Sequence, residues 1–531
     1  MTCLDIIQES MRLASAGKNL EAKKILISAL AQNQNEIEIL NALGDMAHLS
    51  RESDDSLYFY ERSLKVFPQQ PDILFNTALI YKERGSLIKA LDAYTKILDM
   101  SPSDLECLNN RGNIFRELSL FEKAYLDLNK ANEVIGNDVI INSDTFEPWV
   151  IYLNLGNVLI LMGRYEEANI FFDKGLALKP TSFELQRSKG VVLSHLAQYQ
   201  EATNHYHKAL EIKPHDIEIQ LDIALAYLAM GDYDEGLKRY ESRNDIKKFV
   251  GALWTGQEDI SGKIVCIKAE QGFGDTIQFS RYVPLVSMMG AKVYFQVPRP
   301  LQSVMRSLGD QFKIVDEMES GFDFYTHLMS LPFIFKTNPN NIPVKERYLF
   351  AETNKIVFWK KKLNKSERLQ VGLVWHGGFR EKLPHLWHIN RSRNIACEFL
   401  EQLFQLDIDL VSLQKGEEAL DEMKYFLGKY PSYRLIDYSD EIKDFSDTAA
   451  LIENLDLVIA VDTSVAHLAA SLGKETWLLN RFNSCWRWIS SDRTRSPWYP
   501  SVKIFNQIKL GEWGDVMESV KKNLEERIKQ K

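Results

Sequence analysis

A short acidic and hydroxylated turn carries the strongest chemical signal in the sequence. Asp462, Thr463 and Ser464 follow the apolar run Leu457–Val461, and His467 comes about one helical turn later. The apolar run is typical of a buried strand, and Asp, Thr and Ser are common helix N-caps. At the carboxyl edge of a parallel sheet, such a helix start favours phosphorylated ligands. The turn therefore predicts a phosphate site, although an ordinary cap in a βαβ unit gives the same pattern.

A glycine turn near the middle of the chain is the second candidate. Gly272 and Gly274 follow the strand-like run Ile264–Lys268, and Asp275 comes next, at the start of a predicted helix. This is not the dinucleotide fingerprint, because the third glycine is absent. Glycines let the backbone approach a ligand, and Asp275 could take a proton from an acceptor hydroxyl that attacks a sugar. The alternative, which the sequence leaves open, is that Asp275 only caps the helix.

Five further polar residues lie near the ends of predicted strands. His376 could hydrogen-bond a donor or acceptor substrate, which makes it the second catalytic candidate, or it could be structural. Arg391 or Arg393 could neutralise a leaving diphosphate, or both could be solvated surface residues. Gln414 and Lys415 end the next strand and would face the same edge of the sheet.

An aromatic and arginine cluster follows the last predicted βαβ unit. It comprises Trp486, Arg487 and Trp488, together with the segment 495–500. Its rings could stack on a nucleotide base. Packing of the terminal segment explains the same residues equally well.

The N-terminal half positions no such chemistry and instead repeats itself. A small residue recurs every 34 residues, with one step of 44, at Ser10, Gly44, Ala78, Gly112, Gly156, Gly190 and Ala224. Sixteen residues after each comes a leucine or a ring, at Leu26, Tyr60, Tyr94, Leu128, Phe172, Tyr206 and Tyr240. Small residues let two helices approach, and the larger side chain fills the gap between units. The extra ten residues, within 134–148, are predicted to form a longer helix end or a loop.

This pattern resembles the tetratricopeptide repeat and predicts seven copies over residues 1–244. Such an array forms a solenoid whose concave face usually binds peptide or protein. A stacking or dimerisation scaffold without peptide binding remains the alternative.

After residue 244 the periodicity changes to short β-rich runs that alternate with helical segments, the signature of parallel α/β sheets. We expect strands at 264–268, 292–297, 312–315, 371–375, 409–413, 457–461, 476–479 and 502–505. The predicted organisation is a connector over 245–262, a first Rossmann-type lobe over 263–365 and a second over 366–531 that ends in a helix. The lysine-rich stretch 354–368 would link the lobes.

Composition limits the function classes. The 531 residues are 26% charged and 45% hydrophobic with a net charge of −9, which describes a soluble globular protein and argues against a general nucleic-acid binder. No apolar run approaches the roughly 18 residues of a membrane span. The first residues show no secretory signal, and the five scattered cysteines are typical of free thiols in a reducing cytosol. A cytoplasmic protein without a structural zinc site is expected.

Taken together, the glycine turn 272–275, residues 375–377 and the turn 461–464 with His467 resemble the heptosyltransferase-type family of GT-B glycosyltransferases. With the repeats, and with segments 412–416 and 486–500, the chain resembles bacterial tetratricopeptide-repeat proteins that carry such a domain. The resemblance implies an α-solenoid followed by two Rossmann-type lobes, with Asp275 as the base. It also implies a donor site that includes the turn Asp462–Ser464 and His467.

The expected function is metal-independent transfer of a hexosyl or heptosyl group from a nucleotide-sugar to a protein acceptor recruited by the repeats. The expected donor and phosphate residues are Gly272, Gly274, Arg391, Arg393, Gln414, Lys415, Asp462, Thr463, Ser464 and His467, with Asp275 and His376 catalytic. No cofactor or metal is expected, and the oligomeric state is left open. The alternatives are a glycan or lipid-linked acceptor, and a protein-binding scaffold whose transferase domain has lost activity.

Overall fold

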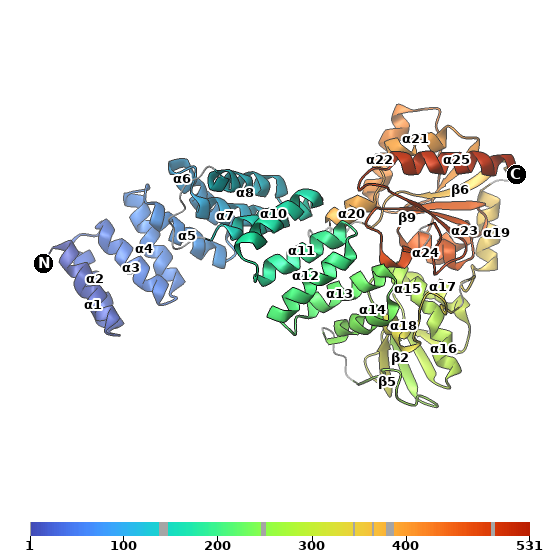
Figure 1. The fold of residues 1–531 in the computed structure, drawn as a ribbon, viewed down its shortest axis with the longest axis horizontal. Coiled ribbons are helices and arrows are strands. Elements are labelled where there is room, and N and C mark those ends of the chain that lie inside the picture. The colour runs from blue at the N-terminus through green and yellow to red at the C-terminus, as the bar shows by residue number, and fades with distance from the viewer. Residues whose placement is uncertain are drawn as a thin grey trace. The chain divides into compact units, whose positions relative to one another are not determined.

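A computed structural model describes residues 2–136, 147–245, 251–343, 346–363, 366–378, 387–489 and 494–530. The chain forms two compact units, Met1–Pro180 and Thr181–Lys531 (Figure 1). Repeats six and seven thus belong to the same compact unit as the sheets, and the predicted boundary after residue 244 stays a prediction. Within the described ranges, no helix combines the length and apolarity that crossing a bilayer requires.

The first unit consists of paired helices. They are α1 (Cys3–Ser15), α2 (Asn19–Gln32), α3 (Ile37–Leu49), α4 (Ser53–Val66), α5 (Pro71–Glu83), α6 (Leu87–Met100), α7 (Leu105–Glu117), α8 (Phe121–Gly136), α9 (Trp149–Leu161) and α10 (Tyr165–Leu178). The insertion expected within 134–148 falls largely on residues 137–146, which lie outside the described residues.

The spacing of sixteen residues is explained by contacts inside each pair. A Cβ added to Gly44 in α3 would lie 2.4 Å from the ring of Tyr60 in α4. The ring is fully buried, and its hydroxyl also accepts a hydrogen bond from Asn76 of the next pair at 3.4 Å. Gly156 and Phe172 repeat this contact at 2.5 Å in α9 and α10. The large side chain therefore fills its own pair first and then reaches the next unit.

The second unit begins with two more pairs of the same kind. They are α11 (Phe183–His195) with α12 (Tyr199–Ile212), and α13 (Ile217–Met230) with α14 (Tyr233–Tyr240), followed by the 3-10 turn η1 (Glu241–Asp245). Gly190 and Tyr206 keep the spacing, since a Cβ on Gly190 would lie 2.4 Å from that ring. The predicted helical repeats are thus confirmed up to the start of the sheets.

A first parallel sheet follows in the order β1-β5-β2-β3-β4. Its strands are β1 (Ala252–Leu253), β2 (Ile264–Lys268), β3 (Lys292–Gln296), β4 (Phe312–Val315) and β5 (Phe324–His327). Helix α15 (Phe273–Phe279) starts five residues after β2 ends. The predicted strands β2, β3 and β4 are confirmed, whereas β1 and β5 were not foreseen. Strand β5 lies next to β2, so the order reverses between these two strands.

The second sheet is also parallel and has the order β11-β10-β9-β6-β7-β8. Its strands are β6 (Leu369–Val374), β7 (Ile408–Ser412), β8 (Ile436–Asp437), β9 (Leu457–Val461), β10 (Thr476–Asn480) and β11 (Val502–Asn506). This is the 3-2-1-4-5-6 order of doubly wound sheets, with its switch point between β6 and β9. Ligands of such sheets bind beyond the carboxyl ends of the strands at that point. The expectation of parallel α/β sheets is therefore confirmed.

Helices cover both faces of the second sheet (Figure 1). Leu457, Ile459 and Val461 of β9 share one core with α21 (Cys397–Phe404), α22 (Glu417–Lys429) and α25 (Gly514–Gln530). Val458 and Ala460, which alternate with them, belong to the other core, with α23 (Phe445–Glu453) and α24 (Ser464–Ser471). The lysine-rich link contains α19 (Thr353–Lys362), which contacts α23.

An aromatic cluster joins the last repeat to both sheets. It consists of Tyr233 in α14, Phe279 in α15, and Trp486 and Trp498, which both lie between β10 and β11. The centroid of the Tyr233 ring lies 5.7 Å from Trp486 and 6.2 Å from Trp498, whose Nε1–H donates to the Tyr233 hydroxyl at 3.2 Å. Trp498 is fully buried. The second unit therefore cannot lose its last repeat without opening its core.

This packing predicts that residues 181–531 fold alone and that residues 245–531 do not. The shorter fragment lacks Tyr233 and exposes the faces of Trp486 and Trp498, and deleting a buried ring costs about 3–5 kcal/mol. Thermal unfolding followed by circular dichroism should show a cooperative transition for fragment 181–531 only. A cooperative transition in fragment 245–531 would contradict the prediction. Tyr233→Ala in the full chain supplies a matched test of the ring alone.

Candidate functional site

A cavity of about 730 Å³ lies in the second unit at the carboxyl ends of β2, β6 and β9. The described residues that line it are Gln271, Gly272, Phe273, Gly274, Asp275, Gly378, Arg393, Asp462, Thr463, Ser464, His467, Cys485 and Arg487. Both sheets therefore present their switch points to one space. The two turns that the sequence marked as chemical candidates lie in the same cavity.

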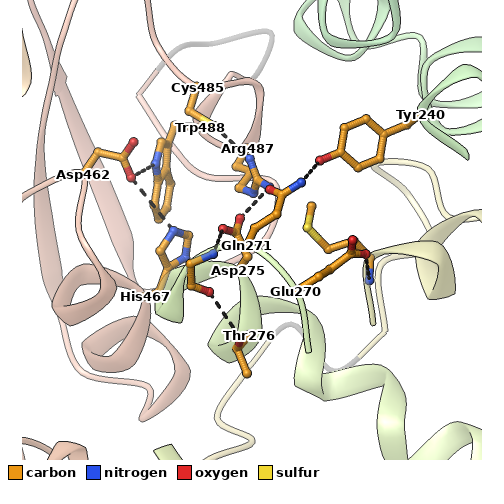
Figure 2. A network of polar contacts seen from close by, with 12 residues as sticks. Tyr240, Glu270, Gln271, Asp275, Thr276, Asp462, His467, Cys485, Arg487 and Trp488 are labelled. Carbon is orange, nitrogen blue, oxygen red and sulfur yellow. Dashed lines mark hydrogen bonds and ion pairs between the residues drawn. The ribbon is translucent and has the colours of Figure 1, made fainter. Parts of the chain in front are cut away.

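Asp275 makes two contacts from the first turn of α15 (Figure 2). Its Oδ2 accepts a hydrogen bond from the backbone N–H of the N-cap residue Gly272 at 3.0 Å. Its Oδ1 pairs with Nη2 of Arg487 at 2.6 Å. The side chain keeps 20% of its surface exposed. Asp275 therefore caps the helix, as the alternative reading held, and also presents a carboxylate to the cavity.

Arg487 brings a buried positive charge to the cavity wall. Its Nη1 donates to the sulfur of Cys485 at 3.1 Å, and its guanidinium lies 4.7 Å from the centroid of the Trp486 ring. Burial alone would lower the pKa of this group, but the carboxylate of Asp275 raises it above the usual range. Arg487 therefore stays charged although only 8% of its surface is exposed.

The turn that follows β9 forms the opposite wall. Asp462 accepts a hydrogen bond on Oδ1 from Nε1 of Trp488 at 2.8 Å. Burial alone would raise its pKa, but the neighbouring His467, the Trp488 bond and the charge of Arg393 bring it below the usual range. Thr463 is the N-cap of α24, yet its side chain makes no capping bond, and its buried Oγ1 has no partner among the described residues. That hydroxyl is suited to a ligand at the start of α24.

His467 packs against Trp488 behind this wall of the cavity. Its ring stacks on Trp488 with 4.6 Å between centroids, and its Nδ1 lies 3.1 Å from the hydroxyl of Tyr499. A Cβ on Gly274 would lie 2.8 Å from His467 Cδ2, so that glycine lets α15 approach α24. Burial lowers the pKa of His467 to about 4, against the effect of the carboxylates of Asp462 and Asp275. The imidazole is therefore neutral at pH 7.

The two candidate arginines differ in their position relative to the cavity. Arg393, in α20 (Trp387–Arg393), donates from Nη2 to the carbonyl of Gly378 at 3.0 Å and from Nη1 to that of Asp462 at 3.4 Å. These carbonyls belong to the segments that follow β6 and β9. Arg391 is exposed and does not line the cavity. Of the two, Arg393 is therefore placed to meet an anionic ligand.

Three other predicted residues are engaged away from this cavity. His376 pairs through Nε2 with Glu422 at 2.9 Å, and burial lowers its pKa against the effect of that carboxylate. Gln414 accepts from the backbone N–H of His376 at 2.9 Å and shapes the loop after β6. The ammonium of Lys415 donates to the carbonyls of Ser439 and Ile442. Nothing in this geometry supports the catalytic role expected of His376 or the donor role expected of Gln414 and Lys415.

Sequence reasoning missed Gln271, Cys485 and Arg487 as parts of this site. Gln271 has a φ of +62°, a conformation that is uncommon for residues other than glycine, and its side chain donates to the hydroxyl of Tyr240 in α14 (Figure 2). No local pattern marks it. Arg487 did carry a signal, since it lies between two tryptophans in the cluster that was noted.

Among the described residues, one group of potential metal ligands gathers closely, at Cys3, Glu36 and Glu38 in the first unit. Its members are partly or fully exposed, and such acidic groups are common at surfaces without an ion. The carboxylates of the cavity, Asp275 and Asp462, do not belong to it. Metal independence of the cavity stays a prediction.

Comparison with known proteins establishes the repeats. The tetratricopeptide repeat family matches residues 150–182 and 196–246. Protein FlbA of Caulobacter vibrioides is 26% identical over 295 residues, which span 51% of this chain and 47% of FlbA. Human protein O-mannosyl-transferase TMTC1 is 24% identical over 206 residues, 32% of this chain and 22% of that protein. The chain thus spans about half of FlbA and about a fifth of TMTC1.

Solved structures resemble the repeats as well. A tetratricopeptide repeat protein from Parabacteroides merdae is 19% identical, with a TM-score of 0.35, and covers 46% of this chain and 93% of its own. Pseudomonas aeruginosa pilF is 18% identical, with a TM-score of 0.33, and covers 40% and 97%. Likenesses at these TM-scores carry no argument about the repeats or the cavity.

The low pKa of His467 predicts that the folded protein loses stability as the pH falls. Unfolded histidine has a pKa of about 6.5, so between pH 6.5 and 4 the unfolded chain binds a proton that folded His467 excludes. This contribution to stability is complete above that window and is lost as the pH falls through it. Between pH 7 and pH 5 the wild type should lose about 2 kcal/mol more stability than His467→Gln.

Urea unfolding midpoints at the two pH values measure this difference. The exposed His215, changed to Gln in the same way, provides the control and should follow the wild type. An equal loss in the wild type and in His467→Gln would show that His467 does not exclude the proton.

Proposed function

We propose that this protein is a glycosyltransferase of the GT-B type that moves a sugar from a nucleotide-sugar to a protein acceptor. One observation carries the proposal: a single cavity joins Asp275, at the switch point of the first sheet, to Thr463 and Ser464, at that of the second. A carboxylate base thus faces a phosphate-binding helix start across a shared space. The division into an acceptor-side lobe and a donor-side lobe belongs to the same proposal.

The donor diphosphate would lie at the start of α24. Thr463 offers a hydroxyl that has no partner among the described residues, and the backbone N–H groups of the first turn carry partial positive charge. Arg393 and Arg487 line the same cavity and bring two positive charges. Two guanidinium groups can neutralise the charge that a divalent cation would otherwise neutralise, because arginine binds phosphate with paired hydrogen bonds.

The acceptor chemistry would centre on Asp275. The acceptor hydroxyl oxygen bonds to C1 of the sugar, the bond from C1 to the diphosphate oxygen breaks, and the hydroxyl proton passes to the Asp275 carboxylate. The nucleoside diphosphate leaves with the bonding electrons, stabilised by the two arginines. Because Arg487 pairs with Asp275 at 2.6 Å, a bound diphosphate would share this guanidinium and release the carboxylate for its role as base.

A protein acceptor is favoured by the repeats. Tetratricopeptide-repeat proteins bind peptides or proteins, and the family matches residues 196–246, which run to the edge of the first sheet. The partial likeness to a human protein named as an O-mannosyl-transferase accords with sugar transfer to protein.

Asp275→Asn should remove most of the transfer activity. The amide keeps the size of the side chain but cannot accept a proton, and loss of a general base commonly costs about 10²–10⁴ in rate. Donor turnover with the natural acceptor is measured by release of nucleoside diphosphate. Asp5→Asn is the control, because Asp5 closes a capping box on α1 in the first unit and does not line the cavity. Turnover of Asp275→Asn within about threefold of wild type would reduce Asp275 to a helix cap.

Arg393→Gln should weaken nucleoside diphosphate binding by about 10- to 100-fold, since a hydrogen bond to a charged group contributes about 1.5–3 kcal/mol. Arg391→Gln in the same helix should change the affinity less than twofold. Titration calorimetry with UDP, GDP and ADP in the presence of EDTA makes the comparison. Binding that vanishes in EDTA and returns with Mg²⁺ or Mn²⁺ would contradict a metal-independent site. Equal affinities of the two variants would show that Arg393 is not part of the nucleoside diphosphate site.

A further inference from the structure

A second cavity, of about 580 Å³, lies beside the candidate site in the second unit. Its walls are the helices α11 to α14 on one side and residues 481–487 on the other. Gln271, Cys485 and Arg487 line both cavities. The second cavity is therefore lined by Arg487, the residue that pairs with Asp275. A side chain of a ligand bound there could extend past Arg487 to that carboxylate.

The wall of the second cavity combines apolar surface with unpaired polar atoms. Leu221, Leu225 and Ala229 of α13 present an apolar strip. Facing it, Asn483 and Trp486 are 6% and 4% exposed, and neither Oδ1 of Asn483 nor Nε1 of Trp486 has a partner among the described residues. Buried polar atoms normally find a hydrogen-bond partner, so an unpaired acceptor and an unpaired donor on one wall indicate a ligand that supplies both.

Two more unpaired atoms extend this set. Among the described residues, neither the buried Oδ2 of Asp222, on α13, nor the buried Nε of Arg487 has a hydrogen-bond partner. Oδ2 of Asp222 forms an ion pair with Nε of Arg187 at 3.8 Å, a distance that is too long for a hydrogen bond. Polar atoms without a hydrogen bond thus occur on both walls of the cavity, on α13 and on residues 481–487. A polypeptide backbone offers N–H and C=O groups alternately along its length, and its side chains can cover an apolar strip.

Other ligand classes fit less well. A lipid chain would cover Leu221, Leu225 and Ala229 but would leave the four polar atoms unpaired, which is unfavourable. A glycan could pair with the polar atoms, but its hydroxyls would then lie against the apolar strip of α13. The combination of both features favours an extended peptide.

We propose that the second cavity binds an extended segment of the acceptor polypeptide and that a hydroxyl-bearing side chain of this segment passes Gln271 and Arg487 to reach Asp275. The transfer step rests on the proposed function. The binding of peptide in the cavity does not, because its contacts other than Arg487 lie outside the diphosphate site. The substrate is then an extended segment of a protein, and it is bound by the last two repeats and by residues 481–487.

Leu225→Trp tests the occupant. Leu225 is 43% exposed, so a larger ring fills the cavity without entering the core. Met230→Trp, on the same helix at 37% exposure and outside the cavity, is the matched control. The full chain is applied to an array of random-sequence 12-residue peptides without nucleotide, and the retained peptides are titrated by fluorescence anisotropy. Asn483→Leu, nearly equal in size, removes the unpaired acceptor and serves as an independent second variant.

We expect a subset of peptides to bind the wild type and Met230→Trp within twofold of each other, and Leu225→Trp and Asn483→Leu at least tenfold more weakly. The proposal is overturned if no peptide distinguishes Leu225→Trp from the wild type, or if the array retains none. It is also overturned if an oligosaccharide or a lipid, but no peptide, competes at this cavity. Nucleoside diphosphate binding through Arg393 is measured separately, so a chain that binds peptide but no nucleotide would refute the transferase while leaving the peptide site in place.

Discussion

The contact on which the second unit depends is the packing of Tyr233 against Trp486 and Trp498. These rings come from the last repeat and from the residues between β10 and β11, and Phe279 of α15 completes the group. Arg281, one turn beyond α15, adds a buried charge that donates to the carbonyl of Trp498 at 3.0 Å and lies 4.5 Å from the Tyr348 ring centroid. Large aromatic surfaces buried together hold three parts of the chain in one arrangement, and the distance from β2 to β9 is fixed as a result.

The charge pair in the cavity follows from that packing. Arg487 is the residue after Trp486, so burying the tryptophan places the guanidinium beside α15, where Asp275 pairs with it. A buried ion pair seldom contributes much net stability, because both charges lose their hydration. This pair lines a cavity together with Thr463, whose hydroxyl has no partner among the described residues, and it is better explained by what it does to a ligand than by what it adds to the fold.

The sequence predicted the parts of the site that are encoded locally. The turns at Asp275 and Asp462 each follow an apolar strand directly, and parallel strands bring their carboxyl ends to one edge, so both could be found without coordinates. Strand β5 (Phe324–His327) could not, because its Tyr, Thr and His residues lack the apolar run that marks a central strand. Arg487 reaches Asp275 only through tertiary packing, and no spacing rule connects them. Gln414 and Lys415 lie at the expected edge, but neighbouring backbone groups already occupy their side chains.

The last repeat is part of the site as well as an approach to it. Tyr240 accepts a hydrogen bond from Gln271, the residue with positive φ at the start of the glycine turn, and Arg243 pairs with Glu270 one residue earlier at 2.8 Å. A turn in an unfavourable conformation persists only where its surroundings hold it, and here two side chains from α14 and η1 do so. A ligand that binds against α13 or α14 therefore lies next to the residues that hold Asp275 in position. The helices that would bind a polypeptide also hold the turn that carries Asp275. This shared set of contacts is a physical reason for the repeats and the two sheets to occur in one chain.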